Sequence, residues 1–208
     1  MPEPATKPLR ADAARNLTAI LRAARAAFEE EGVDVGVDQI ARRAGVGKGT
    51  LYRRFPTKED LVWAVMEDAM SELEAQLDEQ SDTERDPWEA FEAFMESAVR
   101  FQADNRGFFQ SVMSRFGGEG PPEGIHERAL AVMERQLTRA QEAGVVRDDL
   151  TASDLGAVLK MIGAAQPANA PPLPEEVWKR YLALMLDGLR AGAGDPLPGR
   201  PMDLKSRA

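Results

Sequence analysis

Residues 37–61 read VDQIARRAGVGKGTLYRRFPTKEDL. Apolar residues recur at helical spacing on both sides of Gly45-Val46-Gly47, which predicts two short helices, over residues 37–44 and 48–55. The three residues between them are too few for anything but a tight turn, and Gly45 suits a turn position with positive φ. This arrangement is typical of a helix-turn-helix, in which the second helix is free to enter a groove of DNA.

The second of these helices carries side chains that suit DNA. Its outward residues are Lys48, Thr50, Tyr52, Arg53 and Arg54. They combine charge, hydroxyl groups and an aromatic ring, which suits phosphates and base edges in a major groove about 12 Å wide. The net charge is −9, but residues 1–60 hold 11 Lys and Arg against 9 Asp and Glu, whereas the rest holds 15 against 26. Only the N-terminal part is therefore suited to a phosphate surface.

Helical periodicity continues on both sides of this segment. A first amphipathic helix is predicted over residues 12–31, with Gly32 as its C-cap. A fourth starts at a capping box formed by Thr57 and Asp60 and carries an apolar stripe as far as Leu77. Further helices are predicted over residues 87–105, 108–116, 125–143, 151–166 and 174–191. Because no strand pattern interrupts them, the predicted fold class is all-α, and the helix from Pro87, apolar on more than one face, should be central in its domain.

The segment 37–61 resembles the helix-turn-helix of the TetR family of one-component repressors, and the likeness is close over about residues 12–65. The resemblance implies a three-helix DNA-binding domain, residues 1–56, followed by a helical ligand-binding and dimerisation domain, residues 57–192. It also implies the DNA-binding residues, which are Thr18, Arg42, Gly47, Lys48, Gly49, Thr50, Tyr52, Arg53, Arg54 and Lys58. Of these, Lys48, Gly49, Thr50 and Arg53 would lie nearest the bases, and Tyr52 and Lys58 would hold phosphates. Gly47 replaces a common Ser or Thr N-cap, at a cost of a few tenths of a kcal/mol.

The two helices nearest the C-terminus are apolar on broad faces. Two such helices offer more apolar surface than one small domain needs, which predicts a homodimer that pairs them in a four-helix interface. The predicted interface residues are Leu155, Leu159, Ile162, Tyr181, Leu182, Met185 and Leu189. From Gly192 onward, Gly, Pro and scattered charge predict a flexible tail, residues 193–208.

Aromatic and methionine side chains in the second domain suggest an apolar ligand cavity, because such side chains make adaptable walls. The predicted ligand-binding residues are Phe91, Phe94, Met95, Phe109, Met113 and Met133. The same residue types also fill ordinary cores, so both interpretations stay open here.

Several classes of protein are disfavoured. The chain has no cysteine and one histidine, which excludes disulfides and thiolate metal sites and argues against a Ser-His-Asp triad. Glu123 and His126 have the spacing of a helical di-iron motif, but a second such motif is absent. We therefore expect no enzyme activity, no metal and no cofactor. Without an apolar run near the ~18 residues of a membrane span, and without a secretory signal in residues 1–10, a cytoplasmic protein with no membrane contact is expected.

Together these observations predict a sequence-specific DNA-binding transcription regulator. The family resemblance implies a repressor that binds double-stranded DNA at a near-palindromic operator as a homodimer, and that a small, largely apolar effector releases. A helical interaction protein, or an activator of the same fold without small-molecule induction, is the alternative that the sequence leaves open.

Overall fold

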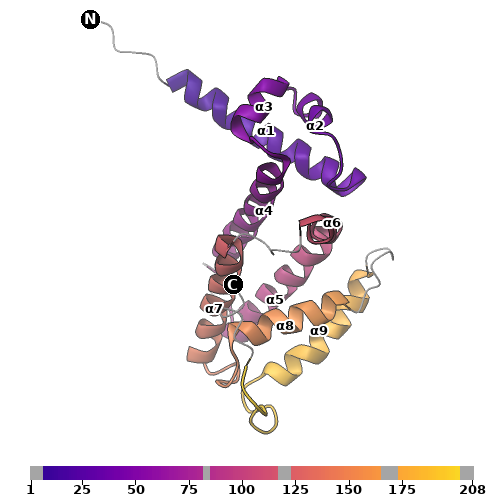
Figure 1. Cartoon of the computed structure of the whole chain (residues 1–208). Helices are drawn as coiled ribbons and strands as arrows, with labels where there is room; N and C mark the ends of the chain where they lie inside the picture. The colour runs from indigo at the N-terminus through magenta and orange to yellow at the C-terminus, as the bar shows by residue number, and fades with distance from the viewer. Residues whose placement is uncertain (1–6, 82–84, 117–122, 165–172, 202–208) are drawn as a thin grey trace, which may run out of the picture. The chain divides into compact units, whose positions relative to one another are not determined.

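The computed structural model describes residues 7–81, 85–116, 123–164 and 173–201. Helices dominate these residues (Figure 1): α1 (Lys7–Glu31), α2 (Val37–Arg43), α3 (Lys48–Arg54), α4 (Lys58–Ser81), α5 (Pro87–Asp104), α6 (Arg106–Phe116), α7 (Glu123–Glu142), α8 (Ala152–Ala164) and α9 (Glu175–Leu189). In the described part of the chain, the extended pairing is limited to an isolated antiparallel bridge between Val146 and Arg190. The predicted all-α fold class is confirmed.

The predicted helix ends rest on local chemistry that the structure confirms. Gly32, Gly45 and Gly144 have φ values of 79°, 68° and 69°, which side chains with a Cβ rarely adopt. At the start of α4, the Thr57 N–H donates to Asp60 Oδ2 at 2.8 Å and the Asp60 N–H donates to Thr57 Oγ1 at 3.0 Å. The Thr57 hydroxyl, donating to the same carboxylate, and then the backbone bond lower the pKa of Asp60. The main difference is that α1 begins at Lys7, five residues earlier than predicted.

Contacts group the described helices in two compact units. The first unit comprises Met1–Ala69 and Asn105–Pro121, and the second comprises Met70–Asp104 and Pro122–Ala208. Helix α4 contributes to both units, and α6 belongs to the first although it lies far along the chain. The contacts therefore divide the chain differently from the predicted boundary at residue 56.

In the first unit, α6 is fixed to α1 by an aromatic pair and a buried hydrogen bond. The rings of Phe28 and Phe108 stack at a centroid distance of 5.8 Å and an interplanar angle of 12°. Both side chains are almost completely buried. Beside them, Arg25 Nη2 donates to Asn105 Oδ1 at 2.8 Å, which satisfies an amide that is itself buried. These contacts make α6 part of the core of the helix-turn-helix unit.

In the second unit, α5 is the central helix, as its apolar positions predicted. It packs against α7, α8 and α9. Its buried residues are Trp88, Phe91, Phe94, Met95, Ala98 and Val99. Among the described helices, none is both long enough and apolar enough to pass through a bilayer.

A cluster of hydrogen bonds around Arg147 and Asp149 holds the segment that follows α9. The Arg147 guanidinium donates to both carboxylate oxygens of Asp149, at 2.5 and 2.8 Å, and to the carbonyl oxygens of Ala193 and Asp195, at 3.0 and 2.8 Å. Asp149 Oδ2 also accepts the Leu197 N–H at 2.8 Å. Residues 193–197 of the predicted flexible tail are therefore anchored, because their backbone groups form hydrogen bonds with Arg147 and Asp149. Residues 202–208 lie outside the described residues.

Replacing Asp149 with Asn should lower the melting temperature at neutral pH and have a smaller effect in acid. The hydrogen bond from Arg147, and then the Leu197 N–H, lower the pKa of Asp149 to about 2. A carboxyl group with a lowered pKa stabilises the fold above its unfolded pKa of roughly 3.9 and loses that effect as the pH falls toward its folded pKa. The difference between wild type and variant should thus be full at pH 7 and shrink below about pH 4. Calorimetry on Asp148→Asn, an exposed neighbour, is the control, and equal shifts at pH 7 would contradict this account.

Candidate functional site

The helix-turn-helix is built on a small apolar core and a closed turn. Ile40 of α2 and Leu51 of α3 are almost completely buried. The Val46 N–H donates to the carbonyl of Ala41 at 3.1 Å, which closes the turn between the helices. Gly47 caps α3 with its carbonyl alone, which accepts the Leu51 N–H at 3.2 Å, and makes no side-chain capping bond. The helix thus forms without the Ser or Thr common at this position.

Most of the predicted DNA-binding residues are on the exposed side of α3. Lys48, Gly49, Tyr52, Arg53 and Arg54 are exposed, and Thr50 is half-buried. The large Tyr52 side chain is 39% exposed, so it is not part of the apolar core. The structure therefore gathers these residues on one short helix that follows Gly47.

The other predicted DNA-binding residues lie outside α3. Arg42 is exposed in the last turn of α2, and Thr18 is exposed on α1 with its hydroxyl donating to the carbonyl of Ala14 at 3.2 Å. Lys58 is half-buried at the start of α4. Burial lowers the pKa of its ammonium group, the carboxylate of Asp34 opposes that change and the charge of Arg115 adds to it.

Lys48 is engaged by an acidic side chain that sequence reasoning missed. Its Nζ donates to Asp38 Oδ2 at 2.8 Å, and this hydrogen bond raises the pKa of Lys48. The same ammonium lies 5.7 Å from the centre of the Tyr52 ring. Asp38 is in the first turn of α2, ten residues away, so only the geometry of the turn brings the two together. A phosphate or base that binds Lys48 therefore competes with this exposed carboxylate for the ammonium group.

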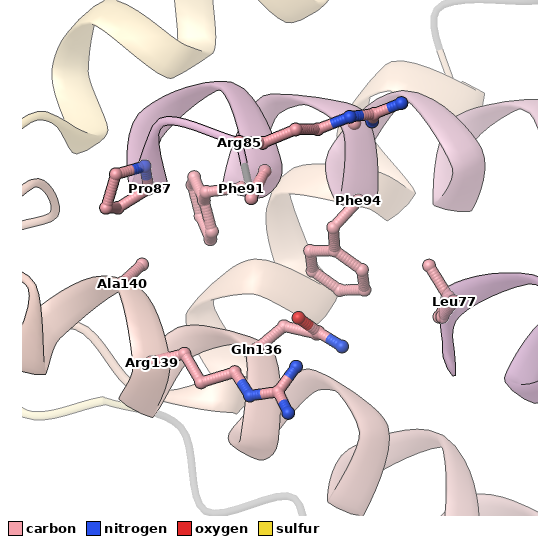
Figure 2. A pocket seen from close by; sticks show the side chains of 10 residues that line it. Leu77, Arg85, Pro87, Phe91, Phe94, Gln136, Arg139 and Ala140 are labelled. Atoms are coloured by element: carbon pink, nitrogen blue, oxygen red, sulfur yellow. The ribbon is translucent and has the colours of Figure 1, made fainter. Parts of the chain in front are cut away.

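The second unit contains a pocket of about 210 Å³ among α4, α5, α7 and the segment before α5 (Figure 2). It is lined by Leu77, Arg85, Pro87, Ala90, Phe91, Ala93, Phe94, Gln136, Arg139 and Ala140. Phe91 and Phe94 are the predicted ligand-binding residues in this lining. Sequence reasoning missed Arg85, Gln136 and Arg139, which gave no apolar signal.

The remaining predicted ligand-binding residues are placed elsewhere. Met95 is fully buried in the core of the second unit, and Met133 is half-buried on α7 outside the lining. Phe109 is on α6 in the first unit, where its ring lies beside that of Phe108. The side chain of Met113 lies outside the described residues. The structure therefore does not bring these four residues to the pocket with Phe91 and Phe94.

Most of the residues predicted for the dimer interface are buried inside one chain. The five buried residues are Leu155, Leu159, Ile162, Leu182 and Leu189. Tyr181 is 37% exposed and Met185 is half-buried. The correction has a physical reason: helices α5 and α7 already cover the more apolar face of α8, and α5 and α8 pack against α9. Those five side chains are core, and a contact between chains needs others.

Other faces of α8 and α9 are apolar and exposed. Met161 is 52% exposed and Leu184 is 65% exposed. Each has small or apolar neighbours at helical spacing, which gives a stripe on each helix. We call these residues the exposed stripe: Ala157, Met161 and Ala164 on α8, and Tyr181, Leu184, Gly188 and the half-buried Val177 on α9.

A helix-turn-helix whose second helix exposes lysine, arginine and tyrosine defines a DNA-binding protein. Comparison with known families agrees: residues 20–65 match the family described as bacterial regulatory proteins, tetR family. Residues 86–191 match a C-terminal domain described as transcriptional regulator SbtR-like. The chain belongs to the TetR family of transcriptional regulators.

Solved and curated relatives support this assignment. A TetR transcription regulatory protein from Mycobacterium vanbaalenii is 37% identical, with a TM-score of 0.67 over 88% of this chain and 99% of that one. A TetR transcriptional regulator from Streptomyces coelicolor is 30% identical, with a TM-score of 0.65 over 85% and 99%. An HTH-type transcriptional regulator of Staphylococcus aureus is 30% identical over 105 residues, which is 50% of this chain and 57% of that protein. The chain thus spans little more than half the length of the curated relatives it matches.

Proposed function

We propose that the protein is a repressor that binds a near-palindromic operator as a homodimer and leaves it when a small molecule occupies the pocket of the second unit. The observation that carries the proposal is the exposed polar side of α3, with Lys48, Tyr52 and Arg53 on a helix that packs through Leu51 alone. A helix held by one buried side chain and largely exposed elsewhere is suited to lie in a groove.

Two copies are needed because one α3 offers few base contacts. Two-fold symmetry places two recognition helices on half-sites one turn of DNA apart, about 34–36 Å between centres. The exposed stripe on α8 and α9 supplies the surface for such a pair, since a monomer would leave Met161 and Leu184 in water.

A ligand in the pocket can regulate DNA binding through α4. Leu77 of α4 lines the pocket, and α4 also contributes residues to the first unit. A ligand beside Leu77 therefore acts on a helix that the DNA-binding unit shares. The ligand releases DNA to the extent that it prefers the non-binding conformation, and a hundredfold preference corresponds to about 2.7 kcal/mol.

The roles of the α3 side chains can be separated with mutants. Arg53→Ala and Thr50→Ala should change base preference, with a loss of about 1–3 kcal/mol on the operator and little on random DNA. Lys58→Ala and Tyr52→Ala should weaken all sequences alike, and Lys58→Ala should also reduce the salt dependence by about one counterion. Operator fragments recovered from genomic DNA with the purified protein, followed by fluorescence anisotropy at two salt concentrations, measure these effects.

Arg43→Ala is the matched control. Its guanidinium already donates to Glu30 at 2.7 Å and to Glu31 at 2.5 Å, so its removal should change DNA affinity little. Equal affinity of the wild type for operator and random DNA would refute specific recognition, and the helical interaction protein would then be the better interpretation.

A further inference from the structure

We infer that the pocket of the second unit binds an anionic amphiphile, with a carboxylate or phosphate head held by Arg139 and Gln136 and a short apolar tail packed on Phe91 and Phe94. The inference rests on the proposed function and deepens it. The sequence predicted only that the effector is largely apolar. The polar residues of the lining add a charged end to that ligand.

The apolar half of the pocket accepts a short tail. Phe91 and Phe94 are each 3% exposed, and Figure 2 shows their rings directed from α5 toward α7, with Leu77 closing one side. A volume of about 210 Å³ exceeds that of a roughly 150 Å³ cavity that holds one benzene ring. The space therefore suits one ring with a few further atoms, or a short alkyl chain.

The polar half of the pocket carries positive charge, which suits an anion. Gln136 and Arg139 are three residues apart on α7, so they share a face, and Figure 2 shows both directed to the same side of the pocket. Arg85, from the segment before α5, adds a second positive charge to the lining. The planar guanidinium group matches a carboxylate or phosphate in a bidentate geometry.

Among the described residues, the pocket lining carries positive charge without a carboxylate beside it. The sequence has 35 acidic against 26 basic residues, yet the lining residues that the structure describes include two arginines and no carboxylate. Within the described ranges, neither arginine makes an ion pair with Asp or Glu. Asp86, next to Arg85 in sequence, instead caps α5 by accepting the Trp88 N–H at 2.9 Å. Among the described residues, no carboxylate thus competes with a ligand for the two guanidinium groups.

Calorimetry on the full chain without DNA tests the inference with three probes of equal chain length: octanoate, octyl phosphate and octanamide. At least one anion should bind, and octanamide should bind about tenfold more weakly or not at all, because it lacks the charge. Arg139→Gln should weaken the anion by about tenfold or more. Arg135→Gln, which removes another exposed charge of α7 outside the lining, should leave binding unchanged. Unchanged melting temperatures show that both variants remain folded.

The results distinguish a carboxylate from a phosphate head group, and failure of the anion site from failure of the proposed function. Preference for octanoate or for octyl phosphate identifies the head group, and either supports the inference. Equal binding of octanamide, equal losses in the two arginine variants, or no binding by any probe would overturn it. Operator binding is measured separately: an anion that binds through Arg139 but leaves DNA affinity unchanged supports this site and removes the effector role. Release of the operator by neutral ligands alone keeps the proposed function and overturns the anion site.

Discussion

Replacing Phe28 with Ala should lower the free energy of unfolding by about 3–5 kcal/mol, the usual cost of deleting a fully buried aromatic side chain. Phe28 is 1% exposed and stacks on Phe108, so its removal leaves a cavity between α1 and α6. Urea unfolding followed by circular dichroism measures the change. A loss below about 1 kcal/mol, in the range of ordinary surface substitutions, would show that α6 does not pack on α1.

A double-mutant cycle checks that the cost belongs to this aromatic pair. Phe28→Ala and Phe108→Ala together should cost less than the sum of the single changes, by about 0.5–1.5 kcal/mol. Phe28→Ala combined with Phe94→Ala is the control, because Phe94 is equally buried but belongs to the second unit. Those two changes should add within about 0.5 kcal/mol.

Leu184→Glu should convert the proposed dimer to a monomer and weaken operator binding by about a hundredfold or more. A two-fold axis would place both new carboxylates in one apolar interface, and a buried unpaired charge costs about 3–5 kcal/mol. Because Leu184 is 65% exposed in the single chain, the substitution should leave the monomer folded. Light scattering at micromolar concentration gives the mass, and anisotropy gives the affinity.

Ala183→Glu is the matched control for this result. Ala183 is also exposed on α9, but it lies on the flank away from the exposed stripe, so its variant should remain dimeric and bind DNA. Leu182→Glu, at a side chain only 1% exposed, should unfold the chain rather than dissociate it. A wild-type protein that is monomeric at micromolar concentration, or a dimer that survives Leu184→Glu, would contradict the assignment.

Much of the fold was predictable because its signals are local. The capping box of Thr57 and Asp60 and the left-handed glycines at 32, 45 and 144 act within a few residues of where they stand in the sequence. The polar side of α3 was predictable for the same reason, since a seven-residue helix that packs through Leu51 must expose its other residues.

The remaining features depend on which helix covers which face. Periodicity identified the apolar faces of α8 and α9 but not that α5 and α7 would bury Leu155 and Leu159, so most of the residues predicted for the dimer interface are buried within the single chain. Likewise, the ion pair of Lys48 with Asp38 joins two separate helices, and the pocket brings together Arg85 and Arg139, which are distant in sequence. No local pattern marks such pairs.

The docking of α6 on α1 has a consequence for synthesis of the chain. Phe28 stacks on Phe108, so the helix-turn-helix emerges from the ribosome well before this residue of its core. At about 5–20 residues per second, the stretch from Ala69 to Phe116 takes roughly 2–9 s to translate. During that interval the nascent α1 lacks the Phe108 ring that covers Phe28, and exposed apolar surface of this kind favours aggregation. A gene fragment ending after α4 would keep that surface permanently, so a stable DNA-binding fragment must include α6.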